Sequence, residues 1–311
     1  MTVGSTPLDD FLSGAGSSTS TGETLQRVGV VLGAGGVIIA VGLLVFVGAV
    51  WRGRAADRVI LLRLAAGAGV IAAVGGVIEV AGVASILDIG WDAALADRLG
   101  RSGMMRLVGG ALVAVGLVES VGRNRSELAG AWQIEPSAFF SLAGAAFSLL
   151  AFGFDGHTAT EGPRVIHALV NAVHLGAAGV WAGGLVGLAI VAVRGGLRGE
   201  GTATFHRFAS AATVAIVVVG VAGIVMAWWV LDSPGGLTST DWGRILLVKT
   251  GLVAIAGAIG AHHHFRVLPR LSTDAASPDV SRQVNVSLGV EAGVLVVVAL
   301  ASGVLATAST V

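Results

Sequence analysis

The sequence predicts an all-α fold: a polytopic membrane helical bundle of about eight transmembrane helices with both termini extracytoplasmic. Composition is the first reason, because 54% of the 311 residues are hydrophobic and 12% are charged, whereas a soluble domain carries about 25% charged residues. The 48 glycines are the second, since most lie inside apolar runs, where small residues let membrane helices approach closely. The third is the length of those runs.

Eight apolar runs come within a few residues of the roughly 20 that a helix needs to cross a bilayer core. They cover approximately 28–50, 60–83, 104–121, 137–154, 165–193, 208–231, 244–264 and 286–308. None shows the apolar–polar alternation of barrel strands. The polar first residues, rich in Ser, Thr and Gly, predict a disordered tail over 1–26 ahead of a transmembrane bundle over 27–311.

The arginines predict the orientation. Connections one, three, five and seven hold 12 of the 19 basic residues, whereas the opposite connections are richer in aspartate. Because basic loops stay in the cytoplasm, these four connections are expected inside and both termini outside.

Composition also excludes several classes of function. The zero net charge argues against a nucleic-acid partner, and the absence of a G-x-x-x-x-G-K-[ST] loop argues against a nucleotide. There is no cysteine, so a metal site would have to use histidine, methionine, carboxylates or backbone atoms.

One face of the fifth run carries polar side chains. Positions 167, 171, 174, 178, 181 and 185 read His, Asn, His, Ala, Trp and Leu, and their spacing places them on one helix face. Such a face is costly in lipid, so we expect it to point into the bundle. His167 and His174 are separated by about 10.5 Å along the axis, too far to share one ion at bonds of about 2 Å.

A single-ion site therefore needs a donor from another segment. His157 lies in the outer loop before the fifth run, and Met104, Met105 and Met226 are expected at a similar depth. Imidazole with thioether suits Cu(I), and imidazole alone suits Cu(II). The structural alternative is that these histidines only hydrogen-bond between helices and the methionines only fill gaps.

Other ionisable residues also lie in the apolar runs. Glu79 could form an ion pair with Arg106, Arg244 or Lys249, or act as an acidic step on an ion path. Glu119 and Glu291 are expected near the inner ends of their helices, within reach of cytoplasmic arginines. The run 262–264 is His-His-His, either an interfacial basic cap or an inner release site.

Several motifs resemble the copper resistance protein D (CopD) family of bacterial inner-membrane proteins over about 137–270. They are Gly156-His157, His174-Leu175, Trp181-Ala182-Gly183-Gly184-Leu185, Phe205-His206-Arg207-Phe208-Ala209, and Trp242-Gly243-Arg244 to Lys249. Trp242 stands where the family usually has tyrosine, and the first three runs match no motif. The resemblance implies copper handling at the plasma membrane, with uptake from the outer side and a periplasmic copper-binding protein as partner. It implies His157 and His174 as ligands, and Trp181, Gly183 and Gly184 as residues that shape helix contacts.

Three hypotheses follow. The first is a copper permease or delivery protein, not an enzyme, with copper captured at His157 and passed to His174. The second is a b-type cytochrome with histidines as axial haem ligands, which requires two histidines at one depth on facing helices. The third is a structural or sensory membrane protein that does not transport.

Overall fold

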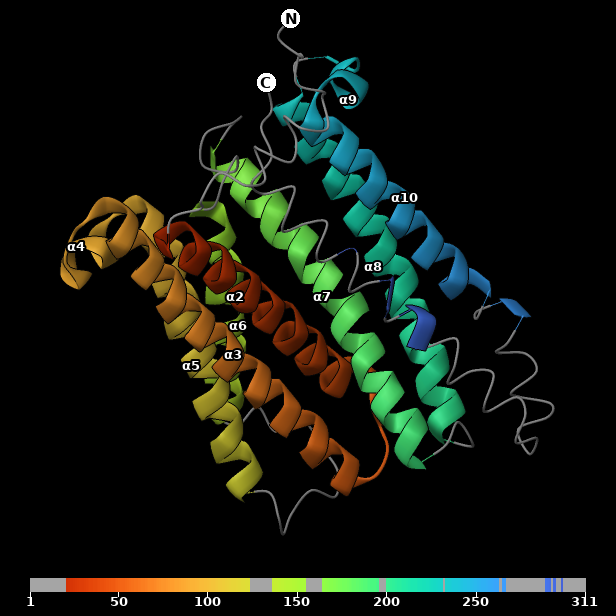
Figure 1. Ribbon diagram of the computed structural model, residues 1–311. Coiled ribbons are helices and arrows are strands. Elements are labelled where there is room, and N and C mark those ends of the chain that lie inside the picture. Colours follow the sequence, from red (N-terminus) through yellow and green to blue (C-terminus); the bar gives the residue numbers. More distant parts are fainter. Residues whose placement is uncertain are drawn as a thin grey trace, which may run out of the picture.

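The computed structural model is a bundle of long helices (Figure 1). It describes residues 21–123, 136–154, 164–195, 200–231, 233–262, 265–266, 289–291, 293–294 and 298. The helices are α2 (Thr21–Val45), η1 (Phe46–Val50), α3 (Ala55–Leu87), α4 (Trp91–Ala96), α5 (Arg98–Arg123), α6 (Pro136–Ala151), η2 (Phe152–Phe154), α7 (Arg164–Gly195), α8 (Glu200–Val230), α9 (Gly236–Ser239) and α10 (Asp241–His262).

The predicted all-α membrane fold is confirmed. Within the described residues, six helices are long and apolar enough to cross a membrane, and Ala138–Phe154 forms a shorter apolar helix. The eighth predicted run, 286–308, lies mostly outside the described residues. α2 begins at Thr21, so residues 21–26 of the predicted tail are helical. Both termini lie outside the described residues, and their side of the membrane remains a prediction.

The helix ends follow local backbone chemistry. α3 ends at Leu87, and the next residue, Asp88, has a left-handed backbone (φ 52°) and donates its N–H to the Ala84 carbonyl. This is a common way for a helix to satisfy its last carbonyls. At the opposite end of the bundle, α2 continues into η1 and stops where Trp51 becomes extended, and extended Arg54 then starts α3.

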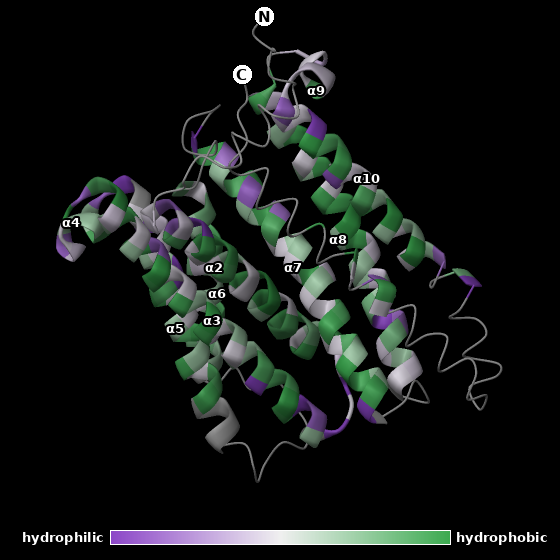
Figure 2. Ribbon diagram, in the orientation of Figure 1, coloured by the Kyte–Doolittle hydropathy of each residue, from purple (hydrophilic) through white to green (hydrophobic). Residues whose placement is uncertain are grey.

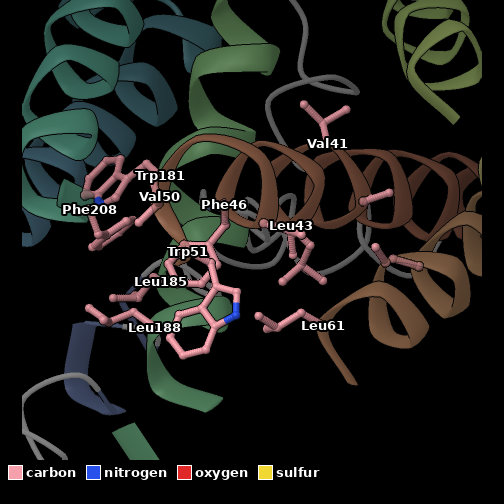
Figure 3. Packing of buried hydrophobic residues seen from close by; sticks show 14 of the residues in the cluster. Val41, Leu43, Phe46, Val50, Trp51, Leu61, Trp181, Leu185, Leu188 and Phe208 are labelled. Atoms are coloured by element: carbon pink, nitrogen blue, oxygen red, sulfur yellow. The ribbon is translucent and has the colours of Figure 1, made fainter. Parts of the chain in front are cut away.

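The helices form two groups that meet at α2 and α7. α2, α3, α5 and α6 pack against one another, and α7 packs against both α2 and α8 (Figure 1). Between the groups lies the main apolar core, to which α2 and η1 contribute Leu43 and Phe46, and α7 contributes Leu185 and Leu188 (Figure 3). Large apolar side chains such as Trp228 point outward instead, as expected where lipid is the solvent.

Glycines bring the backbones of α2 and α7 into contact. A Cβ atom added at Gly42 would overlap the carbonyl oxygen of Gly179, and one added at Gly183 would lie 2.7 Å from Gly42 Cα. The pair Gly179 and Gly183 has the small-x-x-x-small spacing that lets membrane helices cross closely. The two groups of helices are therefore fixed to each other at this crossing.

A polar cluster joins the same groups at the end of the bundle that is predicted to face the cytoplasm, where hydrophilic residues gather on the ribbon (Figure 2). Asp57 of α3 is buried and accepts hydrogen bonds from the Nε atoms of Arg54 and Arg194, each at 3.0 Å. A second contact links α8 to η1, where Arg207 donates to the Val50 carbonyl oxygen at 2.7 Å. We call the Arg54–Asp57–Arg194 contact the inner clasp.

Candidate functional site

The polar face of α7 points into the bundle, as predicted from its spacing. His167 is 2% exposed and His174 is 9% exposed, and Trp181 is also buried. Both imidazoles face α8. The His167 ring lies 5.1 Å from the Trp229 ring, centroid to centroid, at an angle of 49°.

His174 has a defined hydrogen bond to the backbone of α8. Its Nδ1 lies 3.0 Å from the carbonyl oxygen of Val219. A carbonyl oxygen only accepts, so Nδ1 carries the proton and donates it. In a neutral imidazole the other nitrogen, Nε2, then holds the lone pair. Gly223 lies beside the ring, since a Cβ added there would be in ordinary van der Waals contact with His174 Cε1, at 3.6 Å.

Met226 lies on α8 between the levels of the two histidines. His174 meets Val219 and Gly223, and His167 meets Trp229. Positions 219, 223 and 226 share one helix face, and Met226 is half-buried. One thioether therefore lies on the α7–α8 interface, at a depth between the two imidazoles.

The other predicted soft donors are placed differently. Met104 is half-buried and Met105 is buried at the start of α5, a helix that packs mainly against α3 and α6. His157 lies outside the described residues. Within the described part of the chain, no three His, Asp or Glu side chains form a group that could hold a metal ion.

Asn171 ties the polar face to the turn after α6. Its side-chain amide donates to the carbonyl oxygen of Phe152 at 3.1 Å, and the Arg106 guanidinium lies 4.7 Å from the centre of the Phe152 ring. Arg106 in turn forms a buried ion pair with Glu79. The turn from which the loop of His157 departs is thus held from two sides.

Among the partners predicted for Glu79, the structure shows Arg106, and Ser102 also donates to this carboxylate. Arg244 is exposed, and it bonds the Thr238 carbonyl oxygen and contacts Asp241 at 3.5 Å. Lys249 is half-buried on α10. The ion pair that the structure shows for Glu79 is therefore the one with Arg106, not one with Arg244 or Lys249.

Trp181, Gly183 and Gly184 lie at the centre of the bundle. Gly183 forms the close crossing with α2, and a Cβ at Gly184 would lie 2.6 Å from the Phe208 ring. The Trp181 indole N–H donates to the Glu291 carboxylate at 3.1 Å, and Figure 3 shows this tryptophan beside Phe208.

Glu291 was expected near the inner end of its helix, within reach of cytoplasmic arginines, and that expectation stays a prediction. The structure shows that its side chain is buried, with 3% exposed.

Sequence reasoning missed three participants. A backbone carbonyl such as that of Val219 has no sequence signature. Trp229 had a signal, an indole in the outer half of an apolar run. Asp57 had one too, a lone carboxylate among arginines at a helix start.

The fold and this site define a multi-pass helical membrane protein with a line of imidazole, amide and indole groups in its interior. Residues 202–305 match the family model Copper resistance protein D, CopD. The chain is 29% identical over 155 residues to the Copper transport protein CutJ of Bacillus subtilis, which is 49% of this chain and 28% of that protein. It is 31% identical over 170 residues to the Inner membrane protein YebZ of Escherichia coli, which is 53% of this chain and 58% of that protein. No solved structure matches the chain.

The resemblance predicted from the motifs is therefore confirmed: residues 202–305 are similar to the CopD family model, and two curated relatives match about half of the chain. This segment includes α8 from residue 202 onward, α9 and α10. It starts after the His174-Leu175 and W-x-G-G-L motifs of α7, so these motifs lie outside the family match. The alignments span 28% and 58% of the two relatives' lengths.

Proposed function

We propose that this protein carries copper ions across the inner membrane toward the cytoplasm, and that His157, His167 and His174 lie on the path. The observation that carries the proposal is the hydrogen bond of His174. Histidines that bind metals usually donate their other ring N–H to a carbonyl or carboxylate, which fixes the ring and the tautomer. The Val219 carbonyl does this for His174 and leaves Nε2 as the nitrogen available to a metal.

The chemistry of the interface favours a soft metal. Two imidazoles lie on the α7–α8 interface, and the helical spacing places Met226 on the same face of α8. Imidazole with thioether suits Cu(I). His157, in the loop outside, would take the ion first. The names of the relatives, a copper transport protein and an inner membrane protein, support copper as cargo and the inner membrane as location. A periplasmic copper-binding protein would deliver the ion.

The test measures copper accumulation in cells that lack other importers. His157→Ala and His174→Ala should each lower accumulation at least about tenfold, since even a lost supporting residue typically costs 10–100-fold in metal affinity. His206→Ala is the matched control, because this imidazole is exposed at the inner end of α8 and should leave accumulation unchanged. If both test variants accumulate copper like the wild type, the proposed path is wrong.

Metal analysis and an absorption spectrum of the purified protein separate the alternatives. A Soret band would show that the protein binds haem, and it would favour the cytochrome hypothesis over copper transport. His167 and His174 lie at different depths on one helix, an arrangement that does not provide two axial ligands for one haem. Copper binding that is unaffected by His174→Ala would favour a purely structural polar face.

A further inference from the structure

Arginines gather around the inner clasp, at the end of the bundle that is predicted to face the cytoplasm (Figure 2). Arg52 and Arg54 lie in the connection from η1 to α3, and Arg58 lies in the first turn of α3. Arg194, in the last turn of α7, joins them through its bond to Asp57. These four arginines, which we call the inner arginine group, surround one carboxylate, so together with Asp57 they carry a net charge of +3.

Asp57 uses only some of the donors of its two partners. Arg54 reaches one Asp57 oxygen through Nε at 3.0 Å and Nη2 at 2.9 Å, and Arg194 reaches the other oxygen through Nε at 3.0 Å. Each guanidinium has five N–H donors. Because 64% of the Arg54 side chain and 46% of the Arg194 side chain are exposed, donors of both remain accessible at the surface.

Arg58 adds a donor without an acceptor. Its Nε is buried and has no hydrogen-bond partner within the described part of the chain, whereas buried polar groups in proteins normally have one. Arg58 also follows Arg54 by four residues, a spacing at which two like charges on a helix repel. An anion bound beside this turn would offset that repulsion.

The start of α3 contributes in the same direction. Arg54 is its N-cap residue and offers no side-chain oxygen to the first amides of the helix. Helix N-termini carry unsatisfied N–H groups and the positive end of the helix dipole, and they are common sites for phosphate. The charges, the accessible donors and the helix end therefore all favour one kind of ligand, a phosphate group.

We propose that the inner arginine group binds the phosphate of an anionic phospholipid from the cytoplasmic leaflet. Val193, the neighbour of Arg194, is 77% exposed, as expected for a side chain that meets acyl chains. Apolar and cationic surfaces thus adjoin, which suits a lipid better than free phosphate. Anionic lipids of this leaflet attract basic residues at the membrane surface. The site goes beyond the proposed function and does not involve copper.

The bound phosphate would act on the inner clasp. Arg54 belongs to the start of α3 and Arg194 to the end of α7, and their two positive charges are held against a single carboxylate. A phosphate that accepts from both guanidiniums would supply a second negative charge, in charge-assisted hydrogen bonds. The lipid would therefore strengthen the link between these two helices.

The test titrates the protein, purified in a neutral detergent, with phosphatidylglycerol, phosphatidylcholine or inorganic phosphate. We expect phosphatidylglycerol to bind at least about tenfold more tightly than the other two, and its affinity to fall with added salt. Arg52→Gln combined with Arg58→Gln should lower the affinity for phosphatidylglycerol about 25-fold, roughly fivefold for each arginine. This variant keeps both arginine contacts of Asp57, so the clasp itself remains.

The matched control is Arg98→Gln combined with Arg101→Gln. It removes the same charge from two exposed positions at the start of α5, and it should leave the affinity for phosphatidylglycerol unchanged. If the inner double variant does not fold, Arg52→Gln alone, at an exposed position, should lower the affinity about fivefold.

Three results would overturn the inference. Wild-type affinity in the inner variants would exclude these arginines as the site. An equal loss in the control would show that the lipid responds to the charge of the whole protein. Inorganic phosphate that binds as tightly as phosphatidylglycerol would show that the ligand is a free anion and not a lipid. None of these results bears on copper transport, which is measured separately with the histidine variants.

Discussion

The ion pair of Glu79 and Arg106 shows how strongly single residues are constrained here. Arg106 is fully buried against Phe152, and a Cβ at Gly33 would lie 2.7 Å from its Cδ atom. Ser102 also donates a hydrogen bond to the carboxylate. A buried pair like this contributes little net stability, but removal of one partner leaves a charge in the apolar interior.

Arg106→Met should therefore lower the free energy of unfolding by about 3–5 kcal/mol, since breaking a buried pair typically costs that much. The double variant Glu79→Gln with Arg106→Met should recover most of the loss, because neither charge remains. Denaturant titration followed by tryptophan fluorescence measures both. A single variant as stable as the wild type would show that the pair is not closed off from water.

At the scale of helices, the close approach of two backbones depends on which positions are glycine. Gly42 lies directly on the backbone of α7, whereas Gly35, two turns earlier on the same helix, has no atom within 4 Å of an added Cβ. The same substitution at these two positions should thus have opposite effects.

Gly42→Ala should destabilise the protein by about 1–3 kcal/mol, the usual cost of overpacking. Gly35→Ala should be neutral or stabilising by up to about 1 kcal/mol, because alanine is the better helix former. The thermal midpoint in detergent distinguishes them. Equal midpoints in the two variants would argue against a close crossing of α2 and α7.

Helix faces were predictable from the sequence, but their partners were not. The spacing of His167, His174 and Trp181 identified the interior face of α7, because the periodicity of a helix can be read from the sequence of that helix alone. Their contacts depend on the register of a second helix, as with the Val219 carbonyl and the Trp181–Glu291 bond. The burial of Glu291 against Trp181 could not be predicted either, because the position of a residue in its own run does not specify which neighbouring helix it faces.

For the whole molecule, polar links near both ends join the two groups of helices. The inner clasp ties α3 to α7, and near the opposite end of α7 Asn171 ties this helix to the Phe152 turn. Arg54 and Arg194 are partly exposed, with 64% and 46% of their side chains accessible. The inner link is thus the one that salt can weaken.

Asp57→Asn should loosen the inner end of the bundle alone. The neutral amide loses the charge-assisted contacts to both arginines, so amide hydrogen exchange should speed up at the start of α3 and the end of α7. The amides around Asn171 provide the internal control and should exchange as in the wild type. A uniform increase along α7 would mean that the clasp supports the entire helix.

The glycine crossing of α2 and α7 has a mechanical consequence. Gly42 meets Gly179 and Gly183 near the middle of α7, with no side chains between the two backbones to deform. If α7 tilts as a rigid body about this crossing, its two ends move in opposite directions. Any tilt that moved the His167 end of α7 away from α2 would move the Arg194 end toward it.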